Sequence, residues 1–436
     1  MLSFVADYYL EVFTIKSLAK DAIYGALKEC PWIPDPAPLG SYSDDDAIFL
    51  LKDIGPSIKE QGNEERERAI QKGKHYSEML PIEYKPVPEY IELFHQSLKE
   101  ASLRLALATA IVSETILKKH TSESGMGTHL RKWNGDTPPA EECPRWNVPD
   151  GMSPNVVLVS LARAGTPAGV LIKRYIRRFY GIDVPHYSIS IIRDKGIDQN
   201  ALIYILQRHP GCEIQFIDGW TGKGAITNEL FNALLDFEQK FGIVKGTIGR
   251  DMAVLADPGY CAGIFGTRED FLIPSACLNA TVSGLMSRTV YRNDLIGPLE
   301  FHGAKYYREL ASEDLSNYFV NTIARHFTSA HKNARHLLQN NPEIGIDNAP
   351  EWLGKKETRK IQLEFGIKSI NMVKPGVGET TRVLLRRVPW KILVRNIEHP
   401  DIKHILMLAK DRGVPVKEYP GMNYSCCGLI KSMEDN

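Results

Sequence analysis

The stretch IQFIDGWTGKGAI (214–226) places an acid and a glycine-rich turn directly after an apolar run. Asp218 follows the apolar residues, and the turn then leads into a segment with helical periodicity. The turn residues that can approach an anion are Thr221, Gly222, Lys223, Gly224 and Ala225. Glycines let backbone N–H groups come close to a ligand, and a helix N-terminus adds partial positive charge. The pattern predicts a phosphate-binding loop, although it has the spacing of neither a Walker A loop nor a dinucleotide-binding fingerprint.

Two further turns carry polar residues after apolar runs. SLARAGTP (160–167) follows VVLV, and it offers Arg163, Ala164, Gly165 and Thr166 to an anion. RDKGID (193–198) follows SISII, and its charged residues are Arg193, Asp194 and Lys195. Taken alone, each turn is more typical of an ordinary connection between elements. Together they predict one anion site, because the carboxyl ends of parallel strands meet at one edge of a sheet.

The elements that would position these turns alternate between residues 155 and 290. NVVLVSLA is a continuous apolar run, as expected for a strand that is buried on both faces, and HYSISII, EIQFID and MAVLAD are expected to be further strands. Between them lie segments of helical character, including AGVLIKRYIRRFYG, which ends at Gly181. Alternation of this kind predicts a parallel sheet that is covered by helices.

Three domains are expected along the chain. Residues 1–150 form a helical and irregular N-terminal extension, 151–350 the α/β domain, and 351–436 a separate C-terminal domain. Within the extension, the 3.6-residue period of residues 87–120 predicts one long helix or two, and Ser43 with the acids after it predicts a helix start in 41–54. Proline and glycine mark residues 134–151 as a linker.

Composition restricts the classes of protein. The 436 residues include 53 basic and 53 acidic ones, so the whole chain has no bias toward nucleic acid. No apolar run has the length of a membrane span, and the N-terminus lacks the features of a signal peptide. The seven cysteines form no C-x-x-C pair, which favours reduced thiols in the cytoplasm, and no cysteine or histidine set has zinc-ligand spacing.

The three turns together resemble those of type I phosphoribosyltransferases. The resemblance implies that Arg163, Ala164, Gly165 and Thr166 hold pyrophosphate, and that Thr221 to Ala225 hold the 5-phosphate of phosphoribosyl pyrophosphate. It also implies a catalytic set of Asp218, Arg193 and Lys195, with Asp218 on the ribose and the other two on a flap. Magnesium would bind mainly through the ligand, with Asp218 as the one side chain that reaches it.

This sequence departs from that family in two places. A single acid, Asp218, stands where two adjacent acids are usual, and Trp220 stands where purine-specific members carry a general base. Residues 256–292 would cover the acceptor ring, with Asp257, Ser283, Ser287 and Arg288 as candidates. Binding of a phosphoribosyl compound is therefore better supported by the residues than transfer to any particular base.

The C-terminal region is basic: residues 354–395 contain eleven lysines and arginines and three glutamates. The segment VKPGVGETTRVLLRRVPWKILVRNIEHPDIKHILMLAKDRGVPVKEYP resembles Pelota-type RNA-binding domains of α/β/α architecture. The resemblance implies RNA contacts, to structured RNA or tRNA, from Gly378, Glu379, Thr380, Thr381, Arg382, Arg386 and Arg387. Lysine and arginine would supply a salt-dependent attraction to RNA phosphates.

The two units together resemble a bacterial family of tellurite- and stress-resistance operons, which is also labelled stress-induced cysteine protease, StiP. The main expectation is a phosphoribosyltransferase in a nucleoside-like stress pathway, without membrane contact and with a homodimer as one option. A cysteine protease and a non-catalytic nucleotide- and RNA-binding protein are the alternatives. The protease needs a thiolate and a base; the candidates are Cys143, Cys261, Cys277, Cys426 and Cys427 with His129, His186 or His302.

Overall fold

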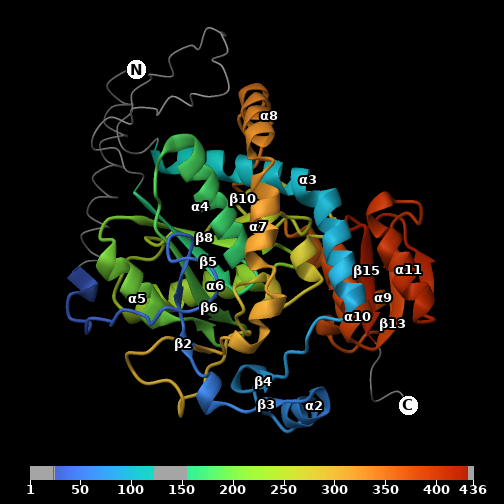
Figure 1. Cartoon of the computed structure of the whole chain (residues 1–436), viewed down its shortest axis with the longest axis horizontal. Helices are drawn as coiled ribbons and strands as arrows, with labels where there is room; N and C mark the ends of the chain where they lie inside the picture. Colours follow the sequence, from blue (N-terminus) through green and yellow to red (C-terminus); the bar gives the residue numbers. More distant parts are fainter. Residues whose placement is uncertain (1–22, 24, 122–154, 431–436) are drawn as a thin grey trace.

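The protein consists of a large α/β unit and a smaller C-terminal α/β unit (Figure 1). The computed structural model describes residues 23, 25–121 and 155–430. The expected linker at 134–151 and the candidate residues His129 and Cys143 lie outside these ranges.

The central sheet of the large unit is almost entirely parallel. Its strands lie in the order β1 (Ile48–Leu50), β6 (His186–Ile192), β5 (Val156–Ala162), β8 (Glu213–Trp220), β9 (Met252–Ala256) and β10 (Ile264–Thr267). The one antiparallel neighbour is the short β7 (Gly196–Ile197), which turns back on β6. Among the middle strands, β5 and β9 form where the sequence is almost continuously apolar, because both faces of a parallel sheet are covered. The prediction of a mixed α/β fold with a mainly parallel sheet is confirmed.

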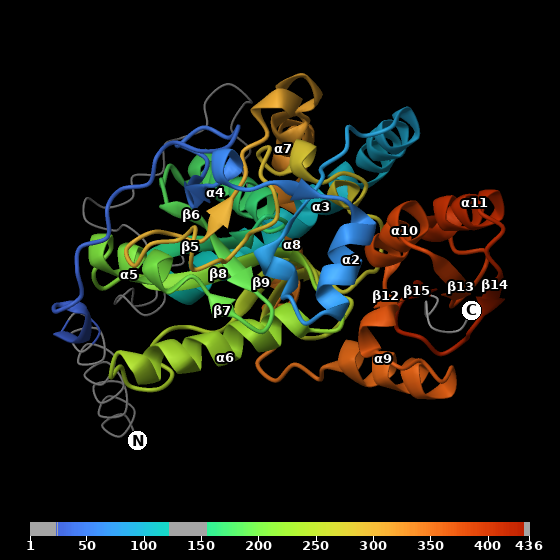
Figure 2. The ribbon, with the colours of Figure 1, turned by 90° about the horizontal axis from the view of Figure 1, so that it is seen from below.

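Helices cover both faces of the central sheet (Figures 1 and 2). One face carries α3 (Pro88–Thr121), α4 (Thr166–Tyr180), α7 (Ser316–Ala324) and α8 (Phe327–Asn340). The other carries α5 (Gln199–Arg208) and α6 (Ala225–Lys240). The 34-residue α3 confirms the long helix expected at 87–120, and α4 ends at Gly181 in the left-handed conformation, as predicted.

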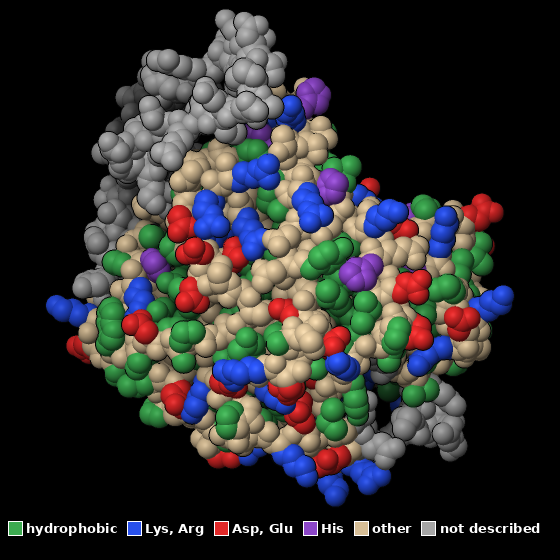
Figure 3. Space-filling model, viewed as in Figure 1, with side chains coloured by type: hydrophobic (Ala, Val, Ile, Leu, Met, Phe, Trp, Pro, Cys, Tyr) green, Lys and Arg blue, Asp and Glu red, His purple; other side chains and the backbone are tan. Residues whose placement is uncertain are grey.

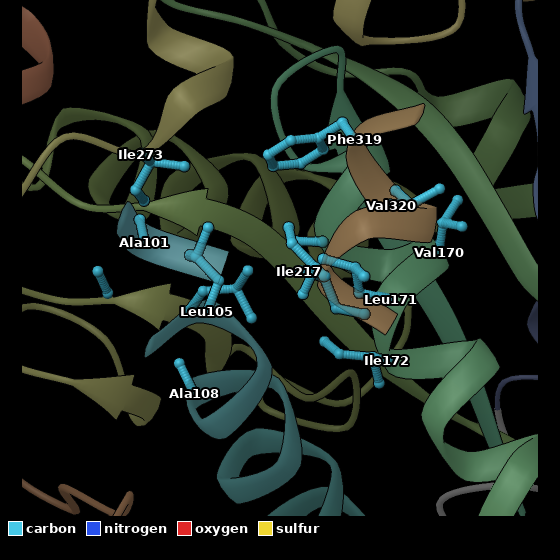
Figure 4. Packing of buried hydrophobic residues seen from close by; sticks show 14 of the residues in the cluster. Ala101, Leu105, Ala108, Val170, Leu171, Ile172, Ile217, Ile273, Phe319 and Val320 are labelled. Atoms are coloured by element: carbon cyan, nitrogen blue, oxygen red, sulfur yellow. The ribbon is translucent and has the colours of Figure 1, made fainter. Parts of the chain in front are cut away.

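The core under α3 and α4 holds the carboxyl edge of the sheet in place. Ala101, Leu105 and Ala108 of α3 and Leu171 of α4 surround Ile217 of β8 (Figure 4). Each of these side chains is buried. Burying a leucine or isoleucine contributes roughly 1.5–3 kcal/mol. The position of the residue after Ile217, Asp218, is therefore set by apolar packing.

The segment before α3 differs from the prediction at one point. Residues 41–54, expected to begin a helix, form a turn followed by β1 and by β2 (Lys52–Asp53). Asp46, one of the acids that were expected to favour a helix start, instead accepts two hydrogen bonds from Arg174 of α4. The run IFLL then joins the central sheet, so the expected N-terminal extension supplies an edge strand to it. Further short elements are β3 (Glu60–Gln61), α2 (Asn63–Gln71), β4 (Leu80–Pro81) and β11 (Gly303–Ala304).

The C-terminal unit has a four-stranded mixed sheet between helices. The strands lie in the order β12 (Val373–Pro375), β15 (Cys426–Ile430), β13 (Pro389–Val394) and β14 (Val416–Glu418). The helices α10 (Val377–Arg386) and α11 (Lys403–Asp411) lie on one side and α9 (Leu353–Glu364) on the other (Figure 2). The arrangement agrees with the expected α/β/α layers.

None of the helices in the described ranges combines the length and the apolar composition that a membrane span requires.

Candidate functional site

The carboxyl edge of the central sheet faces the C-terminal unit. A cleft of about 540 Å³ lies between them, and residues of both units line it. Its basic lining residues are Arg66, Arg163, Arg288, Lys374, Arg382 and Arg387. Its acidic ones are Asp218 and Glu379. Basic and acidic side chains are interspersed on the molecular face of Figure 3. The whole chain has 53 residues of each kind, so this excess of cations is a local property of the cleft.

Asp218 lines this cleft but does not end its strand. β8 continues to Trp220, which pairs with Ala256 of β9, so the prediction that the strand stops at the acid is wrong. The Asp218 carboxylate accepts a hydrogen bond from the N–H of Gly219 at 2.7 Å. Burial raises the pKa of Asp218 to about 7. The carboxyl group therefore titrates near neutral pH.

The turn 221–225, expected to bind phosphate, is packed beneath the C-terminal unit. The Thr221 hydroxyl donates to Asp257, and the Tyr424 hydroxyl donates to the Gly222 carbonyl at 3.2 Å. Lys223 Nζ donates to the carbonyl of Ile370 at 2.8 Å. Burial, together with nearby cations, lowers the pKa of Lys223 to about 8. Gly224 has a φ of 76° and leads into α6 from Ala225, with the ring of Trp352 against it.

The turn 163–166 contributes to the cleft with its first two residues. Arg163 Nη1 donates to the carbonyl of Met286 at 2.9 Å and lies 3.7 Å from the Glu83 carboxylate. Ala164 also lines the cleft. Thr166 instead points into the sheet, where its hydroxyl forms a 2.7 Å hydrogen bond with Ser188. At Gly165 a side chain would collide with the carbonyl oxygens of Ile217 and Leu161, so the glycine permits the close approach of β5 and β8.

The turn 193–198 joins three parts of the molecule. The backbone N–H of Arg193 donates to the Tyr76 hydroxyl at 2.9 Å, and its Nη1 donates to Asn371 of the C-terminal unit at 3.2 Å. Asp194 has a φ of 64°, and its N–H donates to Glu229 of α6. Lys195 is exposed to solvent. The structure thus places Arg193 at the border of the two units, and neither Arg193 nor Lys195 is among the residues that line the cleft with Asp218.

The start of α10, expected to contact RNA, is largely covered. Gly378, Thr380 and Thr381 are buried, and Thr381 bonds internally to His404 and to the Val377 carbonyl. Glu379 and Arg382 form an ion pair of 3.1 Å within the cleft lining. Arg387 is exposed, and the side chain of Arg386 is not among those described.

An acid that the sequence did not single out joins the two units. Asp270 of the large unit accepts hydrogen bonds from the backbone N–H of Val377 at 2.9 Å and of Ser425 at 2.8 Å. The free N–H groups at a helix start favour such a carboxylate. Burial raises the pKa of Asp270 to about 6. Neither Asp270 nor the cleft residue Arg66 belongs to a motif, so only the fold reveals them.

The described candidate thiols are buried. Cys261 follows β9, and its Sγ lies 3.7 Å from Asp257 Oδ1 and 3.9 Å from the Thr227 hydroxyl at the start of α6. Burial and the Asp257 carboxylate raise the pKa of Cys261 to about 12. Burial also raises the pKa of Cys426 and Cys427 in β15. Cys277 is buried next to the cleft residues Ser275 and Leu278.

The candidate histidines are held by other groups. His186 bonds to the Ser160 hydroxyl at 2.7 Å and to the Asp46 carbonyl, and burial lowers its pKa to about 4. His302 bonds to Ser190 at 2.9 Å. Neither is among the hydrogen-bond partners of Cys261. In the part of the chain that the structure describes, no three His, Cys, Asp or Glu side chains gather as a metal site, and the expected magnesium remains a prediction.

Comparison with known proteins places most of the chain in one family. A family described as "Tellurite-like stress resistance cysteine protease StiP" matches residues 40–130 and 146–324. The PELOTA RNA binding domain matches residues 352–432. A curated protein of Acinetobacter baylyi, named "Cysteine protease StiP", is 32% identical over 395 residues, which cover 87% of this chain and 90% of that protein.

These matches overturn the expected phosphoribosyltransferase activity. Both the family and the relative are described as cysteine proteases, which is the alternative drawn from the sequence. The geometry is consistent with this correction. The turn Thr221–Ala225 is occupied by contacts with the C-terminal unit, and Thr166 faces the sheet, so much of the expected phosphoribosyl site faces away from the cleft.

Proposed function

Since this chain belongs to the StiP family of tellurite-like stress resistance cysteine proteases, we propose that it is a cysteine peptidase that acts in a stress response. The observation that carries the proposal is the 32% identity to a cysteine protease across 87% of the chain. The stress-response role expected from the sequence agrees with the description of the family.

We assign the nucleophile to Cys261. The family match includes Cys212, Cys261 and Cys277 but leaves out residues 131–145, which contain Cys143. Cys212 precedes β8 at the amino edge of the sheet, away from the edge where parallel sheets place their ligands. Cys277 is packed in the hydrophobic core, whereas Cys261 lies at the carboxyl edge with a carboxylate near its sulfur.

The surroundings of Cys261 support thiol chemistry in outline. In the closed structure burial and Asp257 raise the pKa of the Cys261 thiol; once the thiol is exposed to solvent, Asp257 Oδ1 is the acceptor we propose for its proton, and the start of α6 stabilises the thiolate. The thiolate then attacks the carbonyl carbon of a peptide bond, the C–N bond breaks, and the amine leaves with a proton. Water hydrolyses the thioester, which releases the acid and restores the thiol.

In the structure this thiol is closed off by the C-terminal unit. The N–H of Trp352 donates to the Tyr260 carbonyl, and the N–H of Gly354 donates to the Gly259 carbonyl, both at 2.9 Å. Tyr424 completes the cover through Gly222. A buried thiol with a raised pKa is inert, so the structure corresponds to a latent state, and activity requires that the C-terminal unit move away from residues 257–261.

Digestion of casein by the full chain under reducing conditions tests the proposal. We expect weak digestion by the wild type, stronger digestion by Tyr424→Ala, and none after treatment with iodoacetamide. Cys261→Ser in the Tyr424→Ala background abolishes digestion, whereas Cys212→Ser leaves it unchanged. Absence of digestion by both wild type and Tyr424→Ala overturns the peptidase; full digestion by the Cys261→Ser variant overturns the assignment of the nucleophile.

A second function, RNA binding, is favoured by the C-terminal unit. Residues 352–432 match an RNA-binding domain, and Lys360, Arg395 and Lys417 are exposed on it. We expect a fluorescent RNA to bind the full chain with an affinity that falls as salt rises, because counterions are released from the phosphates. Binding that does not respond to salt, or no binding at all, contradicts this function.

A further inference from the structure

The cleft between the two units carries more positive charge than its own acids balance. Six arginines and lysines line it, against Asp218 and Glu379. Glu379 is already engaged: it pairs with Arg382 at 3.1 Å and lies 3.7 Å from Lys374. Clustered cations in a partly dry site are costly unless an anion joins them. The cleft therefore suits an anionic ligand.

Arg288 shows this imbalance most clearly. Its Nη2 donates to the carbonyl oxygens of Tyr76 and Met79, which are neutral groups. Its buried Nε has no partner within the described part of the chain. Burial and the cations Arg66 and Arg163 lower the pKa of Arg288 to about 10. The positive charges in the cleft therefore repel one another. A phosphate is an acceptor that suits a guanidinium group.

The rest of the lining has features that suit a nucleotide. Leu161, Pro167, Val282 and Val383 provide apolar surface, and Asn279 an amide that can both donate and accept hydrogen bonds. RNA-binding proteins read single strands in this way, with bases on apolar or planar groups and polar side chains on the base edges. A space of about 540 Å³ matches a drug-sized ligand, on the order of one nucleotide. A double helix exceeds it.

We infer that the cleft holds one nucleotide of a single RNA strand, and that arginines of the large unit bind its phosphate together with basic residues of the C-terminal unit. This inference rests on the RNA binding proposed above. It adds where the RNA binds, and that the bound RNA is single-stranded. The start of α10 cannot serve alone, since its first N–H group, that of Val377, is held by Asp270 and its threonines are buried. RNA in the cleft is therefore bound by both units, with Arg163 on one wall and Arg387 on the other.

The test compares charge removal inside and outside the cleft in the full chain. Arg163 belongs to the large unit, so Arg163→Ala changes no residue of the C-terminal unit. The control is Lys245→Ala, an exposed lysine of the same unit in the segment before β9, at the opposite edge of the sheet. The measurement is the fluorescence anisotropy of a short labelled single-stranded RNA at several salt concentrations, repeated with the corresponding duplex and with labelled AMP.

We expect Arg163→Ala and Arg387→Ala each to weaken single-strand binding about tenfold and to reduce the salt slope by about one, because each removes a phosphate contact. Lys245→Ala leaves both unchanged, and the duplex binds more weakly than the single strand.

RNA binding that survives Arg163→Ala but is lost in Lys391→Ala/Arg395→Ala overturns the inference and leaves the proposed RNA binding intact. AMP binding as tight as that of the RNA, and lost in Arg163→Ala, assigns the cleft to a free nucleotide and also overturns it. No RNA binding by the wild type overturns both.

Discussion

At the scale of single residues, the site depends on acids whose surroundings change their chemistry. Asp218 lies below a group of arginines, yet burial dominates and raises its pKa to about 7. Asp257 accepts from Thr221 and from the N–H groups of Cys261 and Ala262, and it pairs with Arg268. These two carboxyl groups thus have different tasks. Asp257 holds the loop around Cys261 in place through its hydrogen bonds. Asp218 is a carboxyl group in the cleft whose protonation changes near neutral pH.

The raised pKa of Asp218 predicts a pH dependence of stability. The folded-state pKa of about 7 lies above the ordinary value of 3.8, so the folded protein holds this proton more tightly than the unfolded chain. The contribution is complete below pH 3.8 and is lost as the pH rises through about 7. We expect the melting temperature of the wild type to fall over this interval relative to that of Asp218→Asn, which has no such proton.

The control for this effect is Asp236→Asn, which changes an exposed acid on α6. Its melting temperature is expected to follow that of the wild type across the same pH range. Parallel curves for the wild type and Asp218→Asn would mean that Asp218 is ionised in the folded protein at all pH values tested, contrary to its burial.

At the scale of elements, residues of the C-terminal unit cover the Cys261 loop. Tyr424 is the residue of this cover whose replacement tests the contact. Replacing Tyr424 by alanine removes its hydrogen bond to Gly222 and opens space beside Gly354. We expect Cys261 in Tyr424→Ala to react with iodoacetamide at least about tenfold faster than in the wild type, because alkylation of a protected site follows local opening. Peptide mass spectrometry quantifies the reaction.

Cys427 provides an internal reference in that measurement, because it is fully buried in β15. An equal gain in reactivity at Cys261 and Cys427 would indicate general unfolding of the C-terminal unit. That outcome would contradict a local cover.

The contact between Asp270 and α10 is a second element-level prediction. Asp270→Ala leaves two N–H groups without their acceptor, at a cost of about 1–3 kcal/mol. We expect faster hydrogen exchange in residues 373–385 and 424–427, with the central sheet unchanged. Asp411→Ala, an exposed acid at the end of α11, serves as the control. Unchanged exchange around α10 in Asp270→Ala would show that other contacts dock the C-terminal unit.

The elements themselves were largely predictable, whereas their contacts were not. Runs such as VVLV and HYSISII predict strands because they are rich in apolar and β-branched residues, and the structure confirms them. The acids at 44–46 misled the prediction of a helix, because Asp46 pairs with Arg174, far away in sequence. The turn 221–225 has the composition of an anion loop, but no local pattern reveals that Trp352 and Tyr424 cover it.

At the scale of the whole molecule, a chain with equal numbers of acidic and basic residues concentrates cations where its two units meet. The same boundary covers Cys261 and forms the cleft. Movement of the C-terminal unit would therefore change access to the thiol and the shape of the cleft together. This coupling would place the proposed peptidase and RNA-binding functions at one interface.

The central claim, that the chain is a cysteine peptidase with Cys261 as its nucleophile, is tested most directly by covalent labelling. The full chain and its Tyr424→Ala variant are incubated with an epoxide inhibitor of cysteine peptidases, and the labelled residue is identified by peptide mass spectrometry. The account predicts a single adduct, on Cys261, that forms faster in Tyr424→Ala. No adduct in either protein, or an adduct confined to another cysteine, would contradict it.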